Sequence, residues 1–345
     1  MPLEKIRWKV GPVVDAHAHF DGGESLRHFY TLHQLVNYTG ANLMAVPGAR
    51  GKDELTWVRD RKNEYPEYFS IFGCMLHDPA KVAAHDGRDL PRQIDALVAA
   101  GFDGLKMLEG KPALRKHWMP LKLDDAYFEP FFAKAEQDRL PLTLHVSDPI
   151  EMWRSPAEGP TYGDLDPQDE FIRQAVAVLE RHPNLRVNFP HFFYLSPQLE
   201  RLSDLFGRFP HILTDLAMGD EFLYYGAADP QKMRDFFIRH EDRIMYGTDL
   251  HDRNSLWHGR AKAELLRLFL ETDGPFENIV HLVTGRAPRV YANGAKTLHG
   301  LNLPDRTLRK VLGGNCIRWT GRSFTPLPAD AAEHASTARV EAAHA

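Results

Sequence analysis

Pro12-Val13-Val14-Asp15-Ala16-His17-Ala18-His19-Phe20 is the stretch of sequence that decides how the rest of the chain is interpreted. Its apolar residues predict a buried β-strand, and because side chains alternate along a strand, His17 and His19 are expected on one face. Two imidazoles on one face can bind a single metal ion. Two unrelated histidines at a strand end are the alternative, since the chain contains 18 histidines. The motif therefore needs support from elsewhere in the sequence.

The composition is that of an ordinary globular protein, with 43% hydrophobic and 26% charged residues in 345 positions. This length suits two average domains or one barrel domain with extensions. The net charge of −5 gives no indication of binding to nucleic acid or to an anionic membrane. Cys74 and Cys316 belong to no paired motif, so neither a disulfide framework nor a cysteine-based zinc site is indicated.

The N-terminal residues contain no apolar signal core, and no apolar run reaches the roughly 20 residues that a membrane span needs. We therefore expect a soluble, cytoplasmic protein whose partner is a small-molecule substrate. The sequence leaves open whether the chain forms a homo-oligomer.

Apolar runs alternate with helical patterns along most of the chain. After the first strand, further strands are predicted at residues 41–47, 69–76, 104–108, 141–146, 185–189, 212–216 and 243–249. Eight strands that alternate with helices predict an α/β fold, a distorted (β/α)8 TIM barrel, in preference to an open doubly wound sheet. No Gly-x-Gly-x-x-Gly follows the first strand, which argues against dinucleotide binding.

Several signals mark the segments between and after these strands. Ser196-Pro197 and Asp229-Pro230 each predict a helix start, and residues 152–168 predict a long loop that shapes a site. Beyond the last strand, helices are predicted at 258–270, 276–291 and 306–319, packed outside the barrel and closing its base or side. Residues 1–325 are expected to form a single domain, and residues 326–345 a flexible tail.

Polar residues stand at the ends of nearly all predicted strands. In a parallel barrel the carboxyl ends of the strands meet on one face, where active sites lie. A strand end is also where polar residues resume for structural reasons, so no single position decides the matter. Three imidazoles and one carboxylate suit zinc, or manganese, iron or cobalt, with a coordination position left for water or substrate. The strand-end residues are His17 and His19, then Lys106, His145, His191, Asp215 and Asp249.

The sequence resembles the amidohydrolase superfamily, and within it the amidohydrolase-related branch that includes aminocarboxymuconate-semialdehyde decarboxylase. The resemblance covers most of the chain. It rests on Val-Asp-Ala-His-Ala-His, Gly-Phe-Asp-Gly-Leu-Lys-Met, Leu-Pro-Leu-Thr-Leu-His-Val, Pro-His-Phe, Met-Tyr-Gly-Thr-Asp and Val-Leu-Gly-Gly-Asn-Cys-Ile-Arg-Trp.

The resemblance implies that His17, His19 and His145 bind one divalent metal, most often Zn2+, with Asp249 as a further ligand or close neighbour. His191 would orient substrate or polarise the attacking water, although Pro190 before it departs from the pattern. Lys106 stands where binuclear members carry a carboxylated lysine that bridges two metals, so a second metal stays open, as does a role in substrate binding.

Three functions remain open at this stage. The first is metal-dependent hydrolysis of a C–N or C–O bond in an amide, ester or lactone, with Asp249 moving the proton of a metal-activated water. The second is non-oxidative decarboxylation of a small cyclic or aromatic acid. Aromatic and arginine residues in the predicted loops would suit such a substrate: Trp118, Trp153, Tyr225 and Trp257, with Arg154 and Arg253. The third is a barrel without catalysis that acts as a binding protein.

Overall fold

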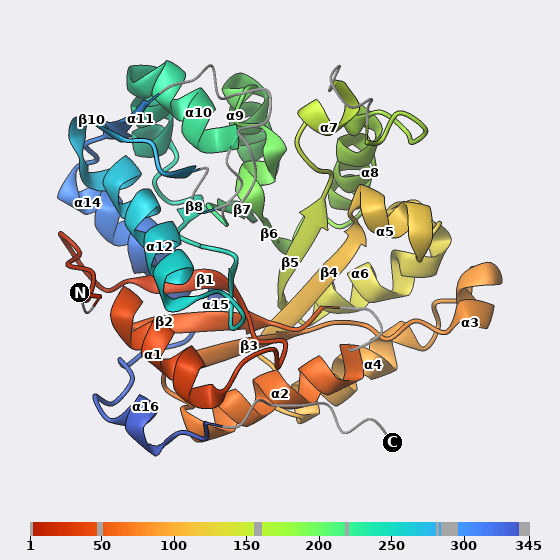
Figure 1. Cartoon of the computed structure of the whole chain (residues 1–345). Helices are drawn as coiled ribbons and strands as arrows, with labels where there is room; N and C mark the ends of the chain where they lie inside the picture. Colours follow the sequence, from red (N-terminus) through yellow and green to blue (C-terminus); the bar gives the residue numbers. More distant parts are fainter. Residues whose placement is uncertain are drawn as a thin grey trace.

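The computed structural model shows a curved parallel sheet surrounded by helices (Figure 1). The structure describes residues 3–46, 51–154, 161–217, 221–280, 283 and 296–337. The distorted (β/α)8 barrel predicted from the sequence is confirmed. Its strands are β1 (Val14–His19), β2 (Gly40–Met44), β3 (Phe69–Gly73), β4 (Gly104–Gly110), β5 (Pro141–Val146), β6 (Arg186–Phe189), β7 (Ile212–Asp215), β8 (Ile244–Met245) and β9 (Leu250–His251).

The strand order is β8-β7-β6-β5-β4-β3-β2-β1-β9, so β1 to β8 follow one another in sequence order and β9 lies at the other edge, beside β1. The predicted eighth strand is present as two short pieces: β8 pairs with β7, and β9 pairs with β1. Between them, Ala16 N–H donates to Tyr246 O and Asp249 N–H donates to His17 O, both at 2.9 Å. The segment from β8 to β9 therefore joins the two edges of the sheet and brings Asp249 beside β1.

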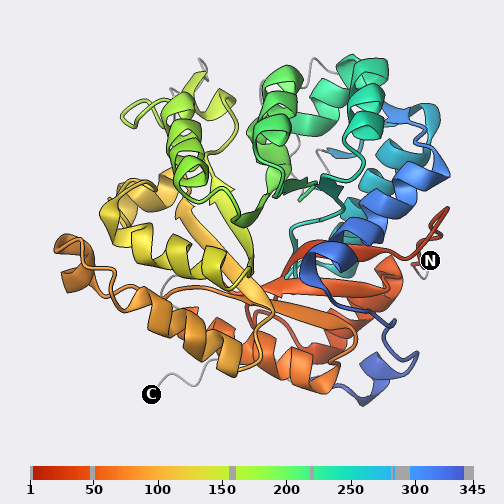
Figure 2. The ribbon, with the colours of Figure 1, turned by 180° about the vertical axis from the view of Figure 1, so that it is seen from behind.

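Helices cover the outside of the sheet in both views (Figures 1 and 2). Among the described helices none is long and apolar enough to cross a membrane. They are α1 (Leu26–Val36), α2 (Gly51–Glu64), α3 (Pro79–Ala83), α4 (Leu90–Ala99), α5 (Pro112–His117), α6 (Glu129–Gln137), α7 (Glu151–Arg154), α8 (Gln168–Arg181), α9 (Leu199–Arg208), α10 (Glu221–Ala228), α11 (Pro230–Arg239), α12 (Leu256–Glu271), α14 (Asp305–Arg309), α15 (Asn315–Thr320) and α16 (Ala331–His334).

The helix predicted over 306–319 is present as α14, a π-helical turn (Lys310–Gly314) and α15. Cys316 and Trp319 of α15 pack against Val14 and Ala16 of β1 and against apolar residues of β2, β3, β7 and β8. This small cluster is buried, so α15 closes one end of the barrel. The polar residues at the carboxyl ends of the strands lie at the other end.

The helix starts predicted by Ser-Pro and Asp-Pro have different outcomes. Asp229 caps α11, since its side chain accepts from Lys232 N–H. Ser196 does not cap a helix, because Gln198 N–H donates to Leu195 O and closes a turn that contains Ser196. The helix α9 therefore begins only at Leu199.

The predicted long loop and the predicted helix over 276–291 are both partly wrong. The loop begins with α7, and its residues 155–160 lie outside the described part. Phe276 lies in β10 (Asp273–Glu277), which pairs antiparallel with β11 (Thr297–Leu301). The sequence around Phe276 does not reveal this pairing, because the partner strand β11 lies some 20 residues further along the chain. Most of residues 278–291 lie outside the described part.

Residues 326–337 pack against α1. Gln34 Nε2 donates to Pro328 O at 2.8 Å and to Ala329 O at 2.9 Å, and Ala331 of α16 is buried. The tail predicted over 326–345 is thus in contact with the barrel domain as far as residue 337, and residues 338–345 lie outside the described part.

Candidate metal centre

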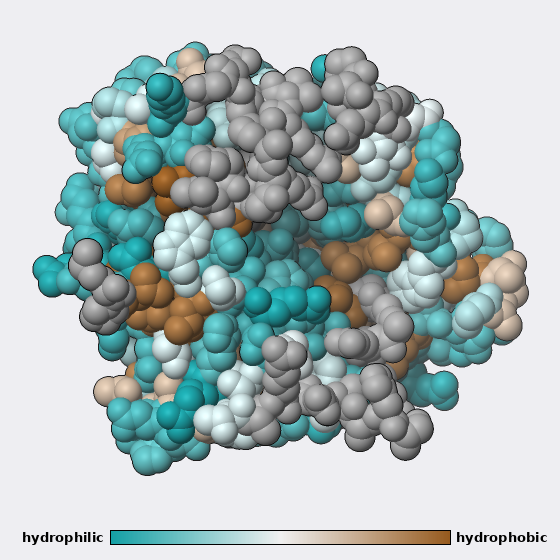
Figure 3. All heavy atoms as spheres, viewed as in Figure 1, coloured by the Kyte–Doolittle hydropathy of each residue, from teal (hydrophilic) through white to brown (hydrophobic). Residues whose placement is uncertain are grey.

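A cavity of about 640 Å3 lies at the carboxyl ends of the strands. This volume is in the usual range for small-molecule sites. In Figure 3 a hydrophilic hollow is visible near the middle of the face, with apolar side chains on both sides. The ionisable residues that line the cavity are the histidines 17, 19, 145, 191 and 251, the acids Asp21, Glu54, Asp148, Glu151, Glu221 and Asp249, and the lysines 106, 111 and 262.

His17, His19 and Asp249 are brought together as the sequence predicted. One ligand atom of each lies within 4.8 Å of the others, and among the described residues this is the group that could hold a metal ion. Asp249 Oδ1 is 3.2 Å from His19 Nε2 and 3.7 Å from His17 Nε2. Ligand atoms about 2.0–2.2 Å from one zinc ion in a tetrahedral arrangement lie about 3.3–3.6 Å apart. The spacing of the group therefore fits a zinc-sized ion.

The hydrogen bonds of the two histidines fix which ring nitrogen carries the proton. His19 Nδ1 is 3.0 Å from the carbonyl of Met44, which can only accept, so Nδ1 is protonated. His17 Nδ1 is likewise 3.1 Å from the carboxylate of Asp215. Each neutral ring thus presents an Nε2 lone pair to the cavity, which is the form that binds metal.

The contact between His19 and Asp249 suits a cation. The lone pair of neutral His19 Nε2 and the carboxylate of Asp249 are both acceptors, yet they lie 3.2 Å apart. An imidazolium would resolve the conflict as well, but burial lowers the pKa of His19 to about 3 and so favours the neutral ring. A divalent ion between the two groups satisfies both of them. The residues present therefore fit a metal ion.

Asp249 is held in an unusual backbone conformation. Its φ of 54° lies in the left-handed region, which a non-glycine residue adopts at a cost. Besides the bond from Asp249 N–H to His17 O, Lys262 Nζ of α12 donates to Asp249 O at 2.8 Å. Lys262 thus fixes the backbone that directs the carboxylate. Sequence reasoning missed this residue, because a lysine in a helix normally indicates a solvated face.

Asp15, the aspartate of the Val-Asp-Ala-His motif, has a structural role. Its Oδ1 accepts from His17 N–H at 3.0 Å and from Thr248 N–H at 3.1 Å, and its Oδ2 accepts from the Thr248 hydroxyl. Burial raises the pKa of Asp15 to about 7. The side chain joins β1 to the segment that carries Asp249, so it aligns the two halves of the candidate metal group.

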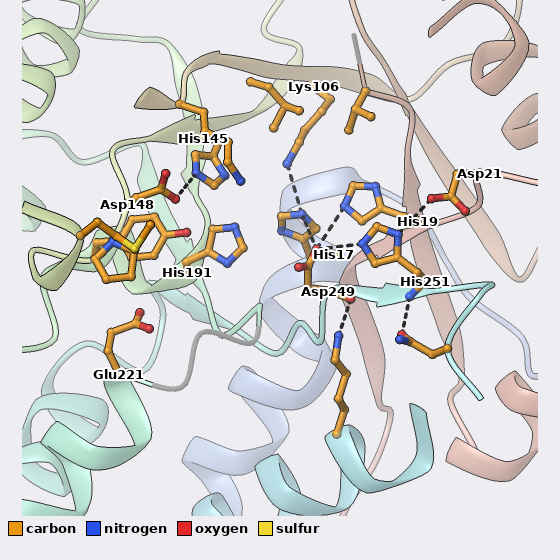
Figure 4. A pocket seen from close by; sticks show the side chains of 18 of the residues that line it. His17, His19, Asp21, Lys106, His145, Asp148, His191, Glu221, Asp249 and His251 are labelled. Atoms are coloured by element: carbon orange, nitrogen blue, oxygen red, sulfur yellow. Dashed lines mark hydrogen bonds and ion pairs between the residues drawn. The ribbon is translucent and has the colours of Figure 1, made fainter. Parts of the chain in front are cut away.

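Lys106 points from β4 toward the same group (Figure 4). Its Nζ lies 3.2 Å from His17 Nε2, and burial lowers the pKa of the ammonium to about 8. The sequence placed this lysine at a second metal or at the substrate, and the structure places it directly beside the candidate metal group.

His145 and His191 lie in the cavity but outside the tight group. The ring of His191 is centred 5.4 Å from His17 and 4.8 Å from His145. His145 Nε2 is 3.0 Å from Ser147 O and 3.5 Å from Asp148 Oδ1. His191 Nδ1 donates to Ala217 O at 3.0 Å, which leaves its Nε2 lone pair free to accept.

The backbone after Pro190 explains how His191 reaches the cavity. Residues 191–194 all have positive φ, so the chain turns sharply at the end of β6. The His191 ring stacks on Tyr194 with centroids 5.2 Å apart. This turn is the altered path that Pro190 indicated in the sequence.

Asp215 received no role from the sequence but is a central positioning residue. Its fully buried carboxylate accepts from His17 Nδ1–H, from Asn188 Nδ2 at 2.7 Å and from His191 N–H at 3.2 Å. A carboxylate behind a metal-binding histidine fixes the ring and makes it a better ligand. His251, also missed, stacks on His19 with centroids 4.6 Å apart.

The loop residues proposed for a flat, acidic substrate do not line the cavity. Arg253 is instead bonded to Asp21, with Nε 3.1 Å from Oδ1. Trp153 Nε1 donates to Asp166 O at 3.0 Å, and Tyr225 donates to Glu151 at 2.6 Å. These contacts hold loops and short helices in place.

Comparison with known proteins shows the family of the chain. A solved structure of 5-carboxyvanillate decarboxylase from Sphingomonas paucimobilis is similar at 14% identity and a TM-score of 0.50, over 90% of this chain and 99% of that one. One of 4-oxalomesaconate hydratase from Rhodopseudomonas palustris has 11% identity and a TM-score of 0.49, over 90% and 96%. No curated protein matches the sequence. The amidohydrolase family model matches residues 14–322, and the chain therefore belongs to the amidohydrolase family.

Proposed function

We propose that the protein is a metal-dependent hydrolase that cleaves a C–N or C–O bond in a small amide, ester or lactone. The observation that carries this proposal is the 3.2 Å approach of His19 Nε2 to Asp249 Oδ1, two acceptors that a divalent cation reconciles. Zn2+ is the proposed ion, with Mn2+, Fe2+ or Co2+ as alternatives.

His17, His19 and Asp249 are the proposed ligands, and His145 is the fourth. Because His145 Nε2 faces Ser147 O, its Nδ1 is the ring nitrogen left to bind. An ion bound by these residues supplies Lewis-acid activation of water and of the scissile carbonyl. In the proposal Asp249 takes the proton of the attacking water and returns it to the leaving group, as a carboxylate within hydrogen-bond reach can do.

His191 orients the reacting groups in this proposal. Its Nδ1–H is committed to Ala217 O, so Nε2 acts as a hydrogen-bond acceptor toward water or substrate. Lys106 can donate, since its Nζ lines the same cavity and lies 3.2 Å from His17 Nε2. The two groups thus give a substrate one acceptor and one donor beside the metal ligands.

A screen of amides, esters and lactones with zinc-loaded protein tests the reaction. We expect turnover that disappears after chelation, returns with zinc, and is lost in Asp249→Asn while zinc stays bound. His85→Ala is a control, because His85 pairs with Asp125 and does not line the cavity. Full activity of Asp249→Asn would reject the role of Asp249.

Decarboxylation of a small cyclic or aromatic acid is the second candidate, because Lys106 and Lys111 line the cavity and could pair with a carboxylate. The product distinguishes the two reactions, since a decarboxylase releases carbon dioxide and a hydrolase releases an amine or alcohol. A protein that binds no metal and no substrate analogue would instead support a catalytically inactive binding role.

A further inference from the structure

Tyr194, which lines the cavity, differs from the other buried tyrosines in its hydroxyl group. Within the described part of the chain this hydroxyl makes no hydrogen bond, although a buried phenol usually has a partner. Its oxygen is not closed off from solvent, so the hydroxyl is open to the cavity. The buried tyrosines whose hydroxyls do have a printed bond to another side chain are Tyr30, Tyr38, Tyr68, Tyr127, Tyr162, Tyr224 and Tyr246.

The backbone that carries Tyr194 is strained. Residues 191–194 have φ values between 51° and 58°, in the left-handed region that residues other than glycine rarely adopt, and none of the four is glycine. Pro190 O accepts from Phe193 N–H and Phe192 O accepts from Leu195 N–H, both at 3.1 Å, and these bonds hold the turn. Strain of this kind clusters at functional sites, so the turn calls for a functional reason.

The turn separates its four side chains by polarity. Phe192 and Phe193 pack in the apolar core. His191 and Tyr194 line the cavity, and their rings stack with centroids 5.2 Å apart and planes inclined by 21°. The strained turn thus places a phenol hydroxyl in the cavity beside a histidine.

The Tyr194 ring lies close to residues that the proposed function uses. Its centroid is 5.7 Å from that of His145, the proposed fourth ligand. On its other side the His191 ring leads to His17, with centroids 5.4 Å apart. Tyr194 therefore contacts one proposed ligand and is connected to a second through His191.

The phenol of Tyr194 is in the form that donates a hydrogen bond. Burial raises its pKa well above the ordinary value, and the nearby carboxylate of Asp148 adds to the rise, so a group that is already protonated at neutral pH stays so. His191 Nε2 is an acceptor. This wall of the cavity thus offers a substrate one donor and one acceptor.

We propose that Tyr194 is a catalytic residue of the proposed hydrolase, whose hydroxyl donates a hydrogen bond to the carbonyl oxygen of the scissile bond. As the oxygen of water bonds to the carbonyl carbon, the carbonyl π electrons move to this oxygen, and the hydrogen bond stabilises the negative charge. Tyr194 transfers no proton in this role. The inference rests on the proposed function for the place of the scissile bond.

Tyr194→Phe removes the hydroxyl and keeps the ring that stacks on His191. With zinc-loaded protein and 4-nitrophenyl acetate we expect kcat/KM to fall about 100-fold, as when one oxyanion donor is removed. 4-Nitrophenyl thionoacetate has sulfur, a poor acceptor, in place of the carbonyl oxygen, so its kcat/KM should fall much less in the same variant. Equal losses with the two esters, or no loss with either, overturn the proposal.

Binding of an anion that does not react gives a second readout. Methyl methylphosphonate carries a tetrahedral, negatively charged centre like the one that water creates by adding to an ester. Calorimetric titration into zinc-loaded protein should show about tenfold weaker binding to Tyr194→Phe than to the wild type, because a hydrogen bond to a charged group is lost. Equal affinity in the two proteins overturns the proposal.

Two matched variants separate this role from a structural one. Tyr68→Phe loses a bond to His33 Nδ1 of 2.9 Å and should unfold at a lower urea concentration than the wild type. Tyr194→Phe loses no such bond and should unfold at no lower concentration than the wild type; earlier unfolding would give the hydroxyl a partner in the folded protein and overturn the proposal. Tyr65→Phe should leave rates and phosphonate affinity unchanged, because Tyr65 does not line the cavity.

The wild type distinguishes this inference from the proposed function. If zinc-loaded wild type turns over no amide, ester or lactone and binds no phosphonate, the hydrolase proposal fails and the role of Tyr194 fails with it. If the wild type hydrolyses 4-nitrophenyl acetate and Tyr194→Phe does so at the same rate, only the role of Tyr194 fails and the hydrolase proposal stands.

Discussion

The two halves of the cavity are built in different ways. The proposed metal ligands His17, His19 and Asp249 stand on the barrel itself, and backbone bonds such as Asp249 N–H to His17 O hold them in register. The other half, with Glu151 and Glu221, is carried by the short helix α7 and the start of α10, and is held by side-chain bonds such as Tyr225 to Glu151. The strand-borne side is therefore fixed by the backbone of the barrel, whereas the other side depends on side-chain contacts between segments added to it.

The largest expected effect is on the barrel side. His19→Ala removes one of the paired acceptors, so we expect zinc affinity to fall by more than about 100-fold, beyond the 10–100-fold typical when a partner that only orients a ligand is lost. Equilibrium dialysis with metal analysis measures it. Glu151→Gln is the matched variant in the other half of the cavity. An equal loss of zinc affinity in His19→Ala and Glu151→Gln would show that the metal ligands are not confined to the strand-borne half.

Lys262→Met tests whether the Asp249 backbone is held from α12. Without the 2.8 Å bond to its carbonyl, Asp249 is freer to leave its left-handed conformation, and zinc affinity should fall about tenfold. Lys262→Arg keeps a donor and should recover part of the loss. Zinc affinity equal to wild type in Lys262→Met would show that the bond has no positioning role.

Glu151 is expected to lower the stability of the folded protein, because its Oε2 is buried without a hydrogen-bond partner. Glu151→Gln keeps an acceptor for Tyr225 but removes the buried charge, so we expect the free energy of unfolding to rise by about 1 kcal/mol in zinc-loaded protein. Urea unfolding measures the change. A loss of stability of similar size would mean that Glu151 Oε2 already accepts a hydrogen bond in the folded protein.

The last prediction concerns His33, which lies outside both halves. Burial lowers the pKa of His33 to about 3, so the folded protein keeps it neutral while the unfolded chain takes up a proton near pH 6.5. Its contribution to stability is therefore full above pH 6.5 and is lost as the pH falls toward 3.

His33→Gln isolates this contribution. Between pH 6.5 and 4.5 the wild type should lose about 1–2 kcal/mol more stability than the variant, measured by urea unfolding in chelator at each pH. Parallel pH profiles for the two proteins would show that His33 does not titrate as its burial requires.

Much of the barrel could be predicted because each strand is a local apolar run followed by polar residues. The proximity of His17, His19 and Asp249 followed from the same pattern, since parallel strands must bring their carboxyl ends together. His145, which was predicted as a further ligand, lies in the cavity but outside this group. Asp215 stood at a predicted strand end, but its bond to His17 depends on register across the barrel, which one sequence does not reveal.

The remaining features depend on contacts between distant segments. Lys262 and Glu151 lie on helices where charged residues are normal, and only the packing of α12 and α7 over the cavity gives them a role. The charged sequence of α2 (Gly51–Glu64) likewise carries no clear apolar stripe, and β10 needed a partner strand in another part of the chain.

Calorimetric titration of Zn2+ into chelator-treated protein, with His19→Ala in parallel, tests the central claim most directly. The account predicts one tight zinc site per chain in the wild type and its loss in the variant. A wild type that binds no zinc, or a variant that binds zinc as the wild type does, would contradict the assignment of His19 and Asp249 as partners of a metal ion.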